Sequence, residues 1–241
     1  MIKIDFLIKQ CARYFGVDLR AYHPSRSESA RLGRLLGHYG IDLVFDIGAN
    51  TGQFAEYLRY VGYQGRIVCF EPLPEPYAQL MKLAERDAGI TCAPRMAIGD
   101  ISGEITINVA ANQESSSILK VLERHLDGEP LARSVGCETV PVQRLDSVAG
   151  DYLRDSTRQF LKIDVQGYEP QVLAGAVELL PKLTGLQLEL SLSPLYEGER
   201  GFREMIDLVE REGFTLHDLN PCYSDSKTGR TFQVDALFFR C

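Results

Sequence analysis

The chain has 241 residues, long enough to bury a substantial core in one large domain without help from disulfides or metals. Hydrophobic residues make up 45% and charged residues 24%, which excludes collagen-like, low-complexity and largely disordered proteins. The formal net charge is −7, and this balance argues against nucleic acid as a partner because phosphate contacts need clustered cations.

The six cysteines show no spacing typical of a metal site or a redox pair. They occupy positions 11, 69, 92, 137, 222 and 241. Cys69 lies inside an apolar run, so we expect reduced thiols in a cytoplasmic protein. The first residues are apolar but broken by Lys3, Asp5 and Lys9, which is not the pattern of a secretory signal. No stretch approaches the ~18 apolar residues that a membrane span needs.

Residues 1–40 are predicted to form an N-terminal helical extension. They hold seven basic and three acidic residues, whereas the chain as a whole is acidic. The apolar spacing predicts an amphipathic helix over 3–15 and a second helix over 27–39, capped by Ser27. We expect the first helix to pack on the core as a lid. Contact of residues 1–20 with a membrane surface, or a homodimer contact, is the alternative.

From residue 41 onward, apolar strands alternate with helices. Strands are expected at 43–47, 66–70, 90–93, 160–164, 185–192, 214–219 and 232–240, and helices at 53–62, 74–87, 169–180 and 202–212. This order predicts an α/β protein with a doubly wound, mostly parallel sheet. Residues 98–150 interrupt the alternation with strands at 104–109 and 138–142 and a helix near 118–126. We interpret them as an inserted β-rich element on the substrate side.

The strongest local motif is Asp46-Ile-Gly-Ala-Asn-Thr-Gly52, where an apolar strand ends in an acid and a glycine-rich turn opens a helix. Gly48 and Gly52 let the backbone approach a ligand closely, and the helix start offers free N–H groups. The spacing is not the GxGxxG of dinucleotide-binding loops, and the loop lacks the Gly-Lys-Ser/Thr of nucleotide triphosphate binders. Taken alone, the motif is also compatible with a tight turn that binds nothing.

Two further acids follow predicted strands. Glu71 lies 19 residues after Gly52 and could accept both hydroxyls of a ribose. Asp164 ends a buried strand that unusually contains Lys162. Because parallel strands end at one edge of a sheet, we expect Asp164 and Glu71 to face one cleft, with Asp164 near the reactive end of a cofactor.

Four motifs in order carry a family resemblance. They are DIGANTG at 46–52, FEP at 70–72, AIGD at 97–100 and KIDVQGYE at 162–169. Together they resemble the FkbM family of S-adenosylmethionine-dependent methyltransferases over roughly residues 41–240. The resemblance implies a class I methyltransferase (Rossmann-like) fold for residues 41–241, with a seven-stranded sheet whose final strand is reversed.

The resemblance also implies roles for individual residues. The cofactor-binding residues would be Asp46, Gly48, Asn50 and Gly52 for the methionine part, Glu71 for the ribose, Ala97 and Asp100 beside the adenine, and Asp164 near the methyl donor. Glu189 matches the family's strand-end acid. Many relatives carry Glu where this chain has Gln166.

Methyl transfer to an alcohol needs a group that takes the hydroxyl proton or a metal that polarises the oxygen. The candidate catalytic residues are Asp164, Glu189 and His125. Asp164 and Glu189 could instead flank a divalent cation. We favour a site without a metal.

The resemblance further implies O-methylation. The runs at 191–199 and 228–240 are similar to members associated with sugar hydroxyls of bacterial glycans. A polyketide or other natural-product hydroxyl is the alternative acceptor. Two hypotheses from other classes are an NAD-dependent oxidoreductase that uses the same ribose-binding acid, and a catalytically silent scaffold.

Overall fold

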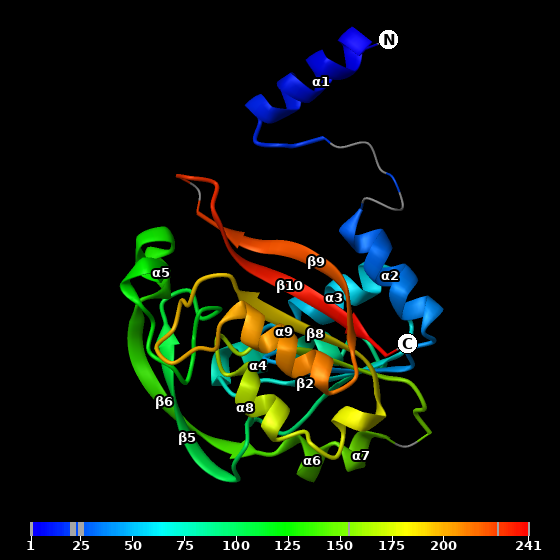
Figure 1. Cartoon of the computed structure of the whole chain (residues 1–241), viewed down its shortest axis with the longest axis vertical. Helices are drawn as coiled ribbons and strands as arrows, with labels where there is room; N and C mark the ends of the chain where they lie inside the picture. The colour runs from blue at the N-terminus through cyan, green and yellow to red at the C-terminus, as the bar shows by residue number, and fades with distance from the viewer. Residues whose placement is uncertain (1, 20–22, 24–26, 154, 226, 241) are drawn as a thin grey trace.

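The computed structural model describes residues 2–19, 23, 27–153, 155–225 and 227–240. Its main sheet has seven strands in the order β3-β2-β1-β7-β8-β10-β9 (Figure 1). They are β1 (Leu43–Ile47), β2 (Arg66–Phe70), β3 (Ile90–Cys92), β7 (Gln159–Ile163), β8 (Leu183–Ser191), β9 (Thr215–Ser224) and β10 (Thr231–Phe239). In this sheet β3, β2, β1, β7 and β8 each pair in parallel with the next strand, whereas β10 runs antiparallel to both β8 and β9. The predicted fold, including its reversed final strand, is confirmed.

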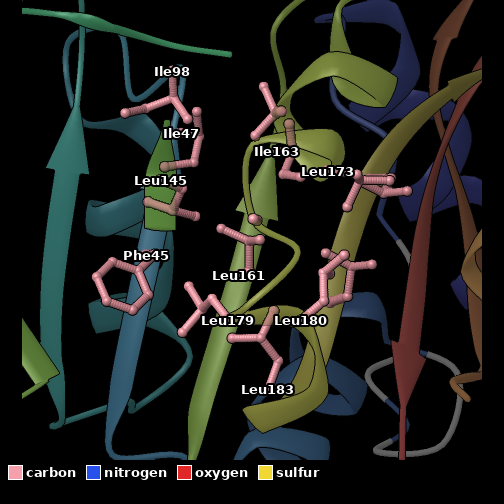
Figure 2. Packing of buried hydrophobic residues seen from close by; sticks show 14 of the residues in the cluster. Phe45, Ile47, Ile98, Leu145, Leu161, Ile163, Leu173, Leu179, Leu180 and Leu183 are labelled. Atoms are coloured by element: carbon pink, nitrogen blue, oxygen red, sulfur yellow. The ribbon is translucent and has the colours of Figure 1, made fainter. Parts of the chain in front are cut away.

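Helices cover both faces of this sheet. The helices on one face are α2 (Glu28–His38), α3 (Gln53–Tyr60) and α4 (Pro74–Ala84), and those on the other are α6 (Leu145–Val148), α8 (Glu169–Ala174) and α9 (Phe202–Arg211), with α7 (Gly150–Leu153) beside them. Strand residues alternate between two cores, so Val44 belongs to the first and Phe45 to the second. Figure 2 shows the second core, with Leu161 and Leu183 packed near Phe45. Burial on both faces explains why these strands are almost wholly apolar.

The β-rich element expected between the third and fourth main strands is a separate three-stranded sheet. It has the order β4-β6-β5, formed by β4 (Ala97–Ile98), β5 (Gly103–Ala110) and β6 (Ser134–Gln143). The helix predicted near 118–126 is displaced to α5 (Glu123–Gly128), because Ser117 and Val121 form bridges to Asn108 and Tyr196 instead.

The helix predicted over 169–180 is also shorter than expected. It ends at Ala174, and a 3-10 turn (Leu180–Lys182) follows. Gly175 follows the helix, and only glycine fits there, since a Cβ would lie 1.9 Å from the carbonyl oxygen of Gly99. This close contact holds the insert against the main sheet.

The two N-terminal helices differ in their packing. Helix α2 buries Leu32 and Leu36 against the sheet, and Ser27 caps it as predicted. Helix α1 (Ile2–Tyr14) stands apart from the sheet (Figure 1), with Leu7 62% and Phe15 74% exposed. The expected lid on the core is therefore wrong for α1, while its contact with a membrane surface or a second copy stays a prediction. Within the described residues, no helix has the length and apolar content needed to cross a membrane.

Candidate active site

A cavity of about 610 Å³ lies at the edge of the sheet where β1, β2, β7 and β8 end. One part, here called the apolar half, is lined by Phe70, Pro72, Leu73, Met96, Ala97, Ile98, Ile107 and Ile118. The other part, the acidic half, is lined by Glu28, Lys162, Asp164, Gln166, Gln187, Glu189, Asn220, Cys222 and Asp235. The residues of the apolar half lie in or after β2, β4 and β5, and those of the acidic half lie in α2 and in or after β7 to β10. Strand β1 lies between β2 and β7 in the sheet and so separates the two halves.

The loop after β1 joins the two halves. Gly48 has φ +78°, and a Cβ at this position would lie 1.9 Å from the carbonyl oxygen of Asp164. The N–H groups of Gly48 and Ala49 both donate to the Phe70 carbonyl at 3.0 Å, which ties the loop to β2. Only glycine satisfies both the backbone angle and this close approach. Gly48 and Asn50 line the cavity, as their motif predicts.

Gly52 has a structural place instead. It precedes α3 with φ +96°, and it is not among the residues that line the cavity. A Cβ there would lie 2.5 Å from the side chain of Leu83 on the neighbouring helix α4. The second glycine of the motif thus allows two helices to pack closely.

Glu71 presents a fixed carboxylate to the cavity. It accepts hydrogen bonds from the N–H groups of Asn50 (2.8 Å) and Leu73 (2.7 Å). Burial raises its pKa to about 7, even though these two hydrogen bonds favour the charged form. The remaining acceptor sites of this carboxylate suit a pair of hydroxyl groups.

Lys162 lies between two acids. Its Nζ is 3.3 Å from Asp46 Oδ1 and 3.2 Å from Asp164 Oδ2. Burial alone would lower its pKa, but the carboxylates of Asp164, Asp46 and Asp235 outweigh burial and raise it, so the lysine stays charged. Asp46 is fully buried and does not line the cavity. Its ion pair with Lys162 explains why a lysine occupies an apolar strand.

Glu189 and Asp235 face each other across β8 and β10. They are direct partners in the antiparallel register, and Asn220 on β9 is opposite Asp235. Burial, together with the carboxylates of Asp164, Asp235 and Glu169, raises the pKa of Glu189 well above its usual range. Burial and the Asp164 carboxylate raise the pKa of Asp235 to about 6. In this region of the cavity, burial and neighbouring carboxylates therefore favour the protonated forms of Glu189 and Asp235.

Sequence reasoning missed Asp235, Gln187 and Asn220. A signal existed for the first, since Asp235 is an acid inside an apolar strand, as Lys162 is a base inside one. The partner strand and the register that bring it to Glu189 are not visible in the sequence.

Besides Asp46 and Gly52, two more predicted site residues lie outside the cavity lining. Asp100 accepts a hydrogen bond from the Tyr168 hydroxyl at 3.4 Å, while Ala97 of the same motif does line the cavity. His125 is 3% exposed and packs its ring against those of Tyr196 and Tyr223. Burial lowers its pKa. The structure does not bring His125 together with the acidic half, so we leave it out of the proposed chemistry.

The alternative for Asp164 and Glu189 is that they bind a divalent metal ion. Among the residues that the structure describes, no three His, Cys, Asp or Glu side chains gather in a group that could hold a metal ion. Asp164 and Glu189 do come together, and both are bridged by Gln166.

Comparison with known proteins agrees with this geometry. The model of the methyltransferase FkbM domain matches residues 46–216, so the chain belongs to the FkbM methyltransferase family. It is 28% identical over 176 residues to the 2-O-methyltransferase NoeI of Sinorhizobium fredii, covering 69% of this chain and 70% of that protein. It is 30% identical over 196 residues to the methyltransferase sdnD of Sordaria araneosa, covering 72% and 73%. Among solved structures, Aeropyrum pernix fibrillarin with bound S-adenosyl-L-methionine has 10% identity and a TM-score of 0.45, with coverage of 83% and 66%.

The protein is an S-adenosylmethionine-dependent methyltransferase. Its cavity fits that cofactor. In the described part of the chain, six carboxylates and one lysine line the cavity, and S-adenosylmethionine carries a cationic sulfonium. Glu71 suits the ribose, and the apolar half suits the adenine.

Proposed function

We propose that this enzyme is an O-methyltransferase that acts on a hydroxyl group of a sugar or glycan. The observation that carries the proposal is the lining of the acidic half, where carboxylates and carboxamides gather from four strands. Such groups bind hydroxyls by hydrogen bonds, and those already paired with the protein, such as Asp164 and Glu189 with Gln166, keep further acceptor sites that an apolar acceptor would not use. The similarity to NoeI, which is a 2-O-methyltransferase, supports transfer to oxygen.

The binding of S-adenosylmethionine is assigned to the loop after β1, Glu71 and the apolar half. When bound, the cofactor supplies an electrophilic methyl group on sulfur. Glu71 would accept hydrogen bonds from the ribose hydroxyls, and the backbone between Gly48 and Asn50 would contact the methionine part. The apolar side chains, including Met96 and Ile98, would exclude water from the adenine.

Glu189 is the group that we assign as the general base. Its raised pKa makes its ionised form a stronger proton acceptor than an ordinary carboxylate. As the acceptor oxygen bonds to the methyl carbon and the carbon–sulfur bond breaks, Glu189 takes the hydroxyl proton. Asp164 is held by Lys162 and would orient the acceptor beside this carboxylate.

The proposal can be tested with isotopically labelled S-adenosylmethionine and a panel of acceptors. The panel would contain monosaccharides, oligosaccharides and apolar natural-product alcohols, each with and without magnesium, and mass spectrometry would locate the added methyl group. We expect an O-methyl sugar as the product, formed at least about 100-fold more slowly by the Glu189→Gln variant. Methyl transfer only to apolar alcohols, or to nitrogen or carbon, would contradict the proposal. The same acceptors incubated with NAD in place of S-adenosylmethionine test the alternative that the protein is an oxidoreductase.

A further inference from the structure

Gln166 is the residue that links the two acids of the active site. It lies in the loop after β7 with φ +57°, a backbone conformation that residues other than glycine rarely adopt. The Oγ of Ser117 donates to its carbonyl oxygen at 2.7 Å and helps to hold the loop. Backbone strain of this kind is retained where the surrounding structure fixes a side chain for a purpose.

The amide nitrogen of Gln166 contacts both acids at once. Its Nε2 is 2.9 Å from Asp164 Oδ1 and 2.8 Å from Glu189 Oε2. The two hydrogens of one NH₂ group can thus serve two carboxylates that follow different strands. Without a donor between them, two carboxylates that approach a common point repel each other.

Tyr196 fixes the orientation of this amide. Its hydroxyl donates to Gln166 Oε1 at 2.8 Å. The ring is only 1% exposed, and burial raises the pKa of the phenol, so the hydroxyl keeps its proton. A flipped amide would place Oε1 against Asp164 Oδ1 and Glu189 Oε2, whereas the observed orientation points the amide donor at both oxygens.

An atom held by oxygens of two carboxylates from neighbouring strand ends has the surroundings that a bridging divalent cation takes in proteins. We propose that the Gln166 carboxamide occupies the place of such a cation and positions Asp164 and Glu189 for catalysis as an uncharged donor. Asp164 and Glu189 then form a pair that is closed to divalent metal by an amide nitrogen. The catalytic consequence rests on the proposed function of Glu189 as base, whereas the occupation of the cation position does not.

The test is a Mn²⁺ titration of the full-length protein without acceptor, in which electron paramagnetic resonance measures the free ion. Gln166→Glu keeps the size of the side chain, removes the nitrogen and adds a third carboxylate between the other two. We expect this variant to bind one Mn²⁺ at least tenfold more tightly than the wild type. Gln166→Leu, which removes the nitrogen without adding a ligand, should not gain that affinity.

Controls separate this effect from added charge and from misfolding. Gln64→Glu adds the same charge at an exposed position outside the cavity lining and should not gain Mn²⁺ binding. Affinity for S-adenosylhomocysteine should stay within about threefold in both Gln166 variants, which shows that they are folded. A Gln166→Glu variant that binds Mn²⁺ no more tightly than the wild type would overturn the inference.

Activity adds a second measurement once an acceptor is found. Wild-type transfer should be unchanged by a chelator, whereas Gln166→Glu should lose at least tenfold in rate with the chelator and recover with added metal. If no hydroxyl acceptor is methylated, the proposed function fails, yet the Mn²⁺ titration still decides the role of Gln166.

Discussion

The two halves of the cavity are built in different ways. The apolar half and the loop beside it come from one continuous part of the chain, from β1 to Ile118 just after β5, in which the motifs follow strands. The acidic half is assembled from α2 and four strands that span residues 28–235. The first half is therefore encoded locally, while the second depends on strand order and register. If this division is correct, changes in the first should alter cofactor binding, and changes in the second should alter transfer.

The largest effect is expected in the acidic half. Glu189→Gln keeps the shape of the side chain but removes its ability to take a proton, so kcat should fall by about 10²–10⁴-fold. Steady-state kinetics with the acceptor found above gives the value. A variant with wild-type kcat would show that Glu189 is not the base.

The cation between the halves should matter for stability. Lys162→Met leaves Asp46 buried without its partner, which should cost about 3–5 kcal/mol in the free energy of unfolding. Denaturant unfolding measures this loss, with the exposed Lys182→Met as the matched control. A second change, Asp46→Asn, should recover part of the loss. If the Lys162→Met protein is as stable as the wild type, the ion pair does not support the site.

The apolar half should show its own dependence on pH. Glu71 has a pKa of about 7, and its charged form is the one that accepts hydrogen bonds from ribose. Affinity for S-adenosylhomocysteine should thus be constant above pH 8 and fall by up to about tenfold per unit below pH 7. Calorimetry from pH 5.5 to 8.5 follows the change. Glu71→Gln should bind more weakly, with little change over the same range, and a pH dependence equal to that of the wild type would remove Glu71 as its source.

A smaller effect is expected in thermal stability. Burial raises the pKa of Glu71 to about 7 and that of Glu169 to about 8, so the folded protein binds more protons than the unfolded chain between pH 6.5 and 8. Stability should therefore decrease as pH rises through this window. The melting temperature should fall by a few degrees per pH unit. Glu169→Gln should flatten this slope, and an unchanged slope would show that the group is not responsible.

The same division decides what could be predicted from the sequence. The cavity position of Gly48, Asn50 and Glu71 could be predicted because a residue at the end of a parallel strand must reach the common edge, while their roles in cofactor binding stay predictions. Asp235 stands out in the sequence only as an acid in an apolar strand, and the pairing with Glu189 that brings it to the site is not visible there. The motifs did not predict the surroundings of Asp46 and Gly52. Asp46 pairs with Lys162, and Gly52 allows a close contact with helix α4; both are tertiary contacts that a local motif does not show.

The end of α8 at Gly175 and the exposure of α1 have the same origin. Periodicity predicted both helices, but α8 ends at Ala174, where Gly175 packs closely on Gly99, and apolar side chains of α1 such as Leu7 are exposed. Local pattern therefore predicted where elements occur, and packing decided their length and partners.

The central claim is that Glu71 serves the cofactor and Glu189 serves the transfer. Calorimetric titration of S-adenosylhomocysteine into the wild type, Glu71→Ala and Glu189→Gln tests it directly, with NAD as the control ligand. We predict binding to the wild type, a loss of roughly 10- to 150-fold in Glu71→Ala for about 1.5–3 kcal/mol of charged hydrogen bonding, and a change below about threefold in Glu189→Gln. Equal losses in the two variants, or unchanged affinity in folded Glu71→Ala, would contradict the account.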